Sequence, residues 1–269
     1  MIDTVLAISV MLAALVVSAG CFLVLWLISL RTKDPSFVDS WWGLGVVVLV
    51  WATYAQIVDP GPHATALLFL GTAWGLRLGI YLLWRWGNHG ADRRYAKMAE
   101  RARTKHGMNF AVFAALWVFL PQMLLQLVLA LPVLVPQITT KLELGWLALA
   151  GIWIAIAGII FEGVADAQLA HFKSQSENKD KVMDRGLWRY SRHPNYFGDL
   201  VTWWGIWLVA LDAGAGLWTL AGPLLITFLL TRVSGAPTTE PHLQKTRPDY
   251  DAYKKRTSAF IPMPPKETQ

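Results

Sequence analysis

Long apolar stretches dominate this chain of 269 residues and confine its charge to a few short segments. Seven stretches approach the roughly 20 residues that an α-helix needs to cross the hydrocarbon core of a bilayer. They lie at residues 4–30, 41–58, 64–86, 110–135, 144–170, 198–213 and 216–233. The chain is 55% hydrophobic and only 16% charged, well below the charge of a typical soluble protein. The sequence therefore predicts an all-α polytopic membrane protein with seven transmembrane helices.

The basic residues predict which side of the membrane each loop faces. Of the 24 Lys and Arg residues, 22 fall in segments 31–40, 85–105, 173–192 and 232–269. With an odd number of spans these segments share one side, which the positive-inside rule makes cytoplasmic. We therefore expect a multi-pass protein of the cell inner membrane, with its N-terminus outside and its C-terminus cytoplasmic. The net charge of +6 is then a topological signal and does not indicate a nucleic-acid partner.

Several carboxylates stand at the cytoplasmic ends of the predicted spans. Glu162 and Asp166 are four residues apart, which places both on one helix face, and Asp39 directly precedes the second span. An ionisable group inside a membrane helix costs about 2.5–3.5 kcal/mol. A structural ion pair is the alternative explanation, or, for Asp39, a helix N-cap. Because these groups share one membrane depth with the basic loops, we expect a site open to the cytoplasm.

The segment that enters the sixth predicted span is dense in polar groups. Residues 192–199 read Arg-His-Pro-Asn-Tyr-Phe-Gly-Asp, and Asn195 and Asp199 are again four residues apart. Backbone N–H groups at a helix N-terminus favour anions, so this segment and the basic loop 87–109 suit a multiply phosphorylated cofactor. Attraction to lipid headgroups also explains basic loops, but it does not explain Asn195 or Asp199. With a single cysteine and no HExxH or CxxC motif, we expect no metal site.

Residues 186–199, GLWRYSRHPNYFGD, resemble the signature of the steroid 5-alpha-reductase superfamily, and more closely its bacterial branch of membrane steroid reductases. Further blocks match in order at 37–43, 74–78, 92–95 and 250–262, so the resemblance covers nearly the whole chain. The RHPNY core alone is less specific. Isoprenylcysteine and phospholipid methyltransferases, which use S-adenosylmethionine, carry a similar block.

The resemblance implies NADPH-dependent reduction of a conjugated carbon–carbon double bond in an apolar lipid, such as the 4,5 bond of a 3-oxo-4-ene steroid. The substrate would enter from the bilayer, among membrane lipids, into a pocket lined by Trp41, Trp42 and Trp74. Within one domain over residues 1–269, residues 1–135 would mainly form this pocket. Residues 136–269 would mainly hold the cofactor and form a cytoplasmic tail.

Carried over by position, the resemblance also implies a set of cofactor-binding residues. They are Arg93, Arg94, Asn109, Glu162, Asp166, Lys173, Lys181, Arg192, His193, Asn195, Tyr196, Asp199, Arg232 and Glu240. The family's acid pair is a glutamate and a tyrosine, and the glutamate position falls on Asp39. The tyrosine position falls near Trp74, which has no hydroxyl. Tyr54 or Tyr95 could take its place, and both stay open as catalytic residues.

Two other functions remain as alternatives. One is a membrane methyltransferase of the isoprenylcysteine or phospholipid type. The basic loops argue against it, because S-adenosylmethionine has no phosphate and carries a positive sulfonium. The other is a non-catalytic protein that binds or transports lipids.

Overall fold

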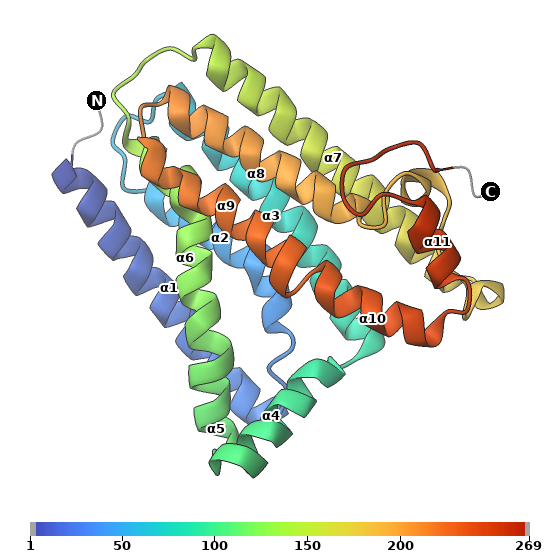
Figure 1. Cartoon of the computed structure of the whole chain (residues 1–269). Helices are drawn as coiled ribbons and strands as arrows, with labels where there is room; N and C mark the ends of the chain where they lie inside the picture. The colour runs from blue at the N-terminus through green and yellow to red at the C-terminus, as the bar shows by residue number, and fades with distance from the viewer. Residues whose placement is uncertain (1–3, 267–269) are drawn as a thin grey trace. The chain divides into compact units, whose positions relative to one another are not determined.

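The computed structural model describes residues 4–266, apart from the side chain of residue 89, and this part of the chain is helical with no strand (Figure 1). The long helices are α1 (Thr4–Thr32), α2 (Val38–Tyr54), α3 (Pro62–His89), α4 (Arg93–His106), α6 (Leu120–Leu134), α7 (Trp146–Ser174) and α8 (Pro194–Asp212). Shorter helices are α5 (Phe110–Phe113), α9 (Ala221–Phe228), α10 (Ala236–Thr246) and α11 (Tyr250–Arg256). The all-α prediction is confirmed.

Five of the described helical stretches are long and apolar enough to cross a membrane, which makes this a multi-pass membrane protein. They are Thr4–Thr32, Pro62–Asn88, Phe110–Ile138, Trp146–Ser174 and Leu217–Thr246. The second and sixth predicted spans correspond to the shorter helices α2 and α8. Seven spans therefore stay a prediction. So does the orientation, and the chain ends that it concerns lie outside the described residues.

Two prolines explain where the helices depart from the predicted spans. Helix α2 ends at Tyr54 instead of residue 58, and Pro60 disfavours helical backbone at residue 59, so the helix does not resume before the loop. In the fourth span a π-helical turn, Ala114–Phe119, precedes Pro121. A proline ring crowds the carbonyl four residues earlier, here Trp117, and the wider π turn accommodates it.

The chain forms two compact units. Unit 1 comprises Met1–Leu149 and Val209–Gly222, and unit 2 comprises Ala150–Leu208 and Pro223–Gln269. The prediction of a single domain is not decided by this division, because each unit is described by itself.

In unit 1, glycines allow α2 and α3 to approach each other closely. A Cβ atom at Gly75 would lie 2.5 Å from the carbonyl oxygen of Gly43, and a Cβ at Gly79 would lie 2.6 Å from Leu44. Gly75 and Gly79 are four residues apart and so share a face of α3. Small residues at this spacing are typical of helix contacts inside membranes, where close backbone packing replaces the hydrophobic driving force.

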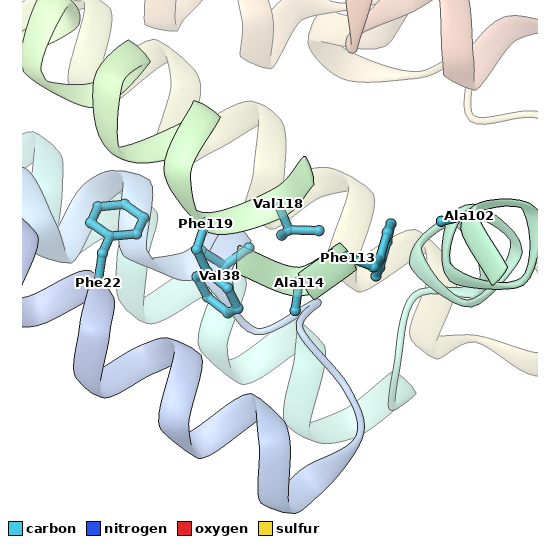
Figure 2. Close-up of a cluster of buried hydrophobic side chains, with 7 residues drawn as sticks. All are labelled: Phe22, Val38, Ala102, Phe113, Ala114, Val118 and Phe119. Carbon is cyan, nitrogen blue, oxygen red and sulfur yellow. The ribbon is translucent and has the colours of Figure 1, made fainter. Parts of the chain in front are cut away.

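A cluster of buried apolar side chains anchors α4 in unit 1 (Figure 2). Its members are Phe22, Val38, Ala102, Phe113, Ala114, Val118 and Phe119. Tyr95, Ala99 and Ala102 lie at i, i+4 and i+7, so they share the face of α4 that packs against this cluster. The charged residues of α4 lie on its exposed face. The cluster thereby places Tyr95 on the inner side of α4 and fixes the start of α2 through Val38.

In unit 2, α7 and α8 meet along a similar line of small residues. A Cβ at Gly158 would lie 2.5 Å from the backbone of Thr202, and a Cβ at Gly198 would lie 2.6 Å from the backbone of Glu162. The polar residues of this unit therefore lie on two helices that approach at backbone distance.

We predict that Gly75→Val lowers the midpoint of thermal unfolding in detergent by roughly 2–10 °C, because the added side chain has to separate α2 from α3. Gly87→Val is the matched control on the same helix, since a Cβ there meets no atom within 4 Å. Equal midpoints for the two variants would show that the α2–α3 contact does not depend on close approach.

Candidate active site

A short hydrogen bond joins Tyr95 to Asp39 in unit 1. The Tyr95 hydroxyl donates to Asp39 Oδ1 at 2.6 Å, across 56 residues of sequence. Asp39 lies in the first turn of α2, whose N-cap is Phe37 without a side-chain cap bond. The N-cap explanation for Asp39 is therefore wrong. Its carboxylate faces α4 instead of capping its own helix.

Two further side chains extend this bond into a chain of hydrogen bonds. Trp42 Nε1 donates to Gln122 Oε1 at 2.9 Å, and Gln122 Nε2 donates to the Tyr95 hydroxyl at 3.3 Å. The four residues come from α2, α4 and α6, so the fold assembles the chain from three helices. Sequence patterns did not indicate Gln122, because a glutamine in an apolar helix belongs to no known motif.

Charged groups meet Asp39 from the other side. Arg94 Nη2 lies 3.5 Å from Asp39 Oδ2 and 2.7 Å from Asp92 Oδ2. Asp92 is also the N-cap of α4, since its Oδ1 accepts from the Arg94 backbone N–H at 2.8 Å. Arg94 thus bridges two carboxylates at the start of the helix that carries Tyr95.

The surroundings fix the protonation of two of these groups. Burial and the nearby Asp39 carboxylate raise the pKa of Tyr95 far above its usual value, so its phenol keeps its proton at any working pH. Burial also raises the pKa of Asp92, but hydrogen bonds from the Arg94 side chain and backbone outweigh this effect. The pKa of Asp92 therefore lies below its usual value.

A hollow of about 600 Å³ lies next to the pair, and Tyr95 forms part of its wall. The remaining wall comes from α4, from residues 91 and 92 before it, and from segments 33–35 and 107–110. Its exposed surface is mainly apolar, with charged groups from Lys33, Asp34, Asp92, Glu100 and Arg103. This volume lies within the range of sites that hold small molecules. Trp41, Trp42 and Trp74, the predicted pocket residues, do not belong to this wall. Trp74 is completely buried.

The structure separates the two tyrosine candidates. Tyr54 is the last residue of α2, about 22 Å along the helix from Asp39. Its hydroxyl lies 3.4 Å from Thr65 Oγ1. Tyr95 is therefore the candidate that reaches Asp39, and the catalytic role of either residue stays a prediction.

The other predicted residues of unit 1 are placed differently. Asn109 is the N-cap of α5, where its Oδ1 accepts from Val112 N at 2.9 Å, and it also lines the hollow. Arg93 is exposed on α4. Helix capping alone accounts for the asparagine at position 109.

In unit 2, one carboxylate holds the RHPNY segment. Glu240 Oε1 accepts from Arg192 Nε at 2.9 Å and lies 3.1 Å from His193 Nε2, while its Oε2 lies 3.1 Å from Lys254 Nζ. Arg192 also donates to the carbonyls of Lys254 and Thr257. Glu240 therefore ties this segment to α10 and α11. With three basic partners it already has the contacts that a buried carboxylate needs, and a cofactor contact at Glu240 stays a prediction.

The C-terminal segment wraps around the same residues. Ser191 pairs with Ser258 in an isolated bridge, and His193 stacks between Tyr196 and Phe260 at ring distances of 5.2 and 5.4 Å. The Tyr253 hydroxyl donates to the carbonyl of residue 188. Sequence analysis did not single out residues 191 and 254, because their partners are far away in the chain.

The seam between α7 and α8 gathers buried acceptors. Asn195 Nδ2 donates to Asp166 Oδ1 at 3.1 Å, and Glu162, Asp166 and Asp199 are all buried. Asn195 Oδ1 is buried and has no hydrogen-bond partner among the described residues. Asp166 already supplies negative charge beside the first turn of α8, so the seam suits a group that donates hydrogen bonds better than a phosphate.

The remaining predicted cofactor residues of unit 2 lie on its surface. Lys173 stands in the last turn of α7, and Lys181 and Arg232 are exposed as well. These exposed basic side chains can be reached by anions from the solvent, whereas the carboxylates of the seam are buried.

A family model covers most of the chain. Residues 25–257 match the family described as "Protein of unknown function (DUF1295)". The chain belongs to this family. It is also 30% identical over 116 residues to Steroid 5-alpha-reductase DET2 from Gossypium hirsutum, and the match covers 43% of each chain. The match thus spans less than half the length of that relative. No solved structure matches.

The two matches support a relationship of this DUF1295 protein to the steroid 5-alpha-reductase superfamily. They do not distinguish branches of it, so the bacterial branch stays a prediction.

We predict that Asp92→Ala speeds amide hydrogen exchange in the first turns of α4 about fivefold at neutral pH, because a lost N-cap costs about 1 kcal/mol. Asp92→Asn keeps the acceptor and is the matched control. Because the pKa of Asp92 is depressed in the folded state, its contribution is complete above the unfolded pKa of about 4 and is lost as pH falls through the folded value. Unchanged exchange in Asp92→Ala would contradict the capping role.

Proposed function

We propose that this protein is an NADPH-dependent membrane reductase of a conjugated carbon–carbon double bond in an apolar lipid, with 3-oxo-4-ene steroids as the first candidates. The observation that carries the proposal is the Tyr95–Asp39 hydrogen bond beside a mainly apolar hollow. The partial match to a protein named as a steroid 5-alpha-reductase supports the substrate class.

The chemistry explains why such a pair is needed. Hydride addition to the β carbon of an enone moves negative charge onto the carbonyl oxygen, and a proton added to the α carbon completes the reduction. A hydrogen-bond donor at the oxygen lowers the barrier, because its interaction strengthens as the charge develops. Tyr95 keeps its phenol proton, and Asp39 in its protonated form is a second donor. Because the Tyr95 proton is directed to Asp39 Oδ1, the protonated Asp39 would donate to the carbonyl oxygen and Tyr95 would hold that carboxyl group in place.

Two different sets of residues in unit 2 fit two different parts of NADPH. When bound, NADPH supplies the hydride. The orphaned acceptor Asn195 Oδ1 and the neighbouring Asp166 would accept from ribose hydroxyls or from the nicotinamide amide. Phosphates would be met by exposed basic side chains such as Lys173 and Lys181. Arg192 is engaged by Glu240 and two carbonyls, so it would position the segment instead of binding phosphate.

The same acidic seam favours one rival. Buried carboxylates also suit the hydroxyls and the positive charge of S-adenosylmethionine, so a membrane methyltransferase is the second candidate function. S-adenosylmethionine has no phosphate for the exposed lysines to bind, and methyl transfer gives no role to the Tyr95–Asp39 pair.

The location of the site follows from the charge pattern of the sequence. The hollow is bounded by residues of the basic segments 31–40 and 85–105, which the positive-inside rule assigns to the cytoplasm. We propose an inner-membrane enzyme whose site opens to the cytoplasm and whose substrate arrives through the bilayer.

We predict that the protein purified in mild detergent binds NADPH and oxidises it when a 3-oxo-4-ene steroid is added. Tyr95→Phe lowers kcat about 100-fold through loss of the hydrogen bond that it donates to Asp39, and Tyr54→Phe changes kcat far less. Asp39→Asn also lowers kcat, which initial rates of NADPH loss measure.

Three results would contradict the proposal. Tight binding of S-adenosylmethionine without NADPH would favour the methyltransferase, and binding of neither cofactor would favour a lipid carrier. An equal loss of rate in Tyr54→Phe and Tyr95→Phe would contradict the assignment of the donor.

A further inference from the structure

Gln122 occupies a place that the proposed reaction does not by itself require. It lies on α6, half-buried, between Trp42 of α2 and Tyr95 of α4. An apolar side chain of the same size would fill this space without a hydrogen bond to either neighbour. The Gln122 amide contacts the phenol of Tyr95 and can therefore influence it.

The neighbours determine which way the amide points. The indole N–H of Trp42 can only donate, so the atom of Gln122 that faces it has to be the carbonyl oxygen. The amide NH₂ then faces the Tyr95 oxygen and donates to it. The phenol accepts on that side, and its single proton is directed to Asp39 Oδ1. The three hydrogen bonds that link Trp42, Gln122, Tyr95 and Asp39 are therefore all donated in the same direction, from Trp42 toward Asp39.

We propose that Gln122 is a positioning residue that holds the Tyr95 phenol as a donor to Asp39, with Trp42 fixing the orientation of the amide. This inference rests on the proposed function of the Tyr95–Asp39 pair. The amide donated to the phenol oxygen polarises the O–H bond and makes it a stronger donor, as in other chains of hydrogen bonds. Asp39 Oδ2 is the oxygen that Tyr95 does not contact, and it lies 3.5 Å from Arg94 Nη2.

The substitution Gln122→Glu reverses this arrangement with almost no change of shape. A carboxylate at position 122 still accepts from Trp42 but cannot donate to Tyr95, so the phenol turns to the new acceptor. Gln122→Leu removes both bonds without offering a new acceptor. We expect kcat to fall about 10-fold or more in Gln122→Glu, by less in Gln122→Leu, and KM to change little in both.

A matched control lies one turn further along α6. Gln126 is buried, and its Nε2 donates to the Trp41 carbonyl at 2.6 Å, with no bond to Tyr95 or Asp39. Gln126→Leu removes a buried amide from the same helix. We expect it to lower the unfolding midpoint while leaving kcat per folded molecule unchanged.

A second readout does not depend on turnover. With tyrosines labelled by carbon-13 at the ring carbon that bears oxygen, the Tyr95 signal is the one absent from Tyr95→Phe, and its pH dependence follows Asp39. The charged groups facing Asp39 are Arg94, Asp92 and Arg85, and substitutions at position 122 change none of them. We expect the midpoint of this titration to move to higher pH in Gln122→Leu, because the Tyr95 phenol becomes a weaker donor to Asp39. It should move further in Gln122→Glu, because the phenol turns to the new carboxylate and the negative charge of that carboxylate opposes the ionisation of Asp39.

The two readouts separate the two proposals. A wild-type protein that reduces no enone would reject the reductase proposal, while the Tyr95 titration would still test the position of the phenol. The inference about Gln122 is overturned if Gln122→Glu leaves the titration midpoint at the wild-type value, or if Gln126→Leu moves it equally.

Discussion

A carboxylate and a phenol set among apolar helices are stable only when each has a hydrogen-bond partner, and in unit 1 Asp39 and Tyr95 are partners of each other. Their contact depends on packing at a distance from it. The cluster around Phe113 and Phe119 holds the inner face of α4 against the start of α2. Helix α4 is rich in basic residues, so without that apolar contact nothing would hold Tyr95 against α2. The polar pair and the apolar cluster therefore belong to one arrangement.

The sequence predicted the helices well, because apolar runs and prolines act locally. It predicted Asp39 as a site residue for the same reason, since a carboxylate beside a membrane span is costly wherever the chain goes. It could not choose between Tyr54 and Tyr95, because their distances from Asp39 depend on how α4 folds back onto α2. The sequence could not indicate Gln122 for a related reason. Its role depends on hydrogen bonds with two residues on other helices.

In unit 2, too, the sequence alone does not show what the site residues do. The RHPNY segment stands out in the sequence, and the structure shows how much of it serves to hold the segment in place. Arg192 and His193 converge on Glu240, and the tail adds Lys254. In the α7–α8 seam, the buried Asn195 Oδ1 has no hydrogen-bond partner among the described residues and so remains for a ligand. The composition of the RHPNY segment suggests an anion site. Its buried part instead supplies hydrogen-bond acceptors and holds the segment in place.

The central claim is that the chain carries out hydride transfer to a lipid enone. Transfer of label from NADPH that is deuterated at both hydrogen positions of its reactive carbon tests this most directly, with the steroid product analysed by mass spectrometry and NMR. The account predicts one deuterium, on the former β carbon of the product. An unlabelled reduced product, or a substrate that gains a methyl group from S-adenosylmethionine instead, would contradict it.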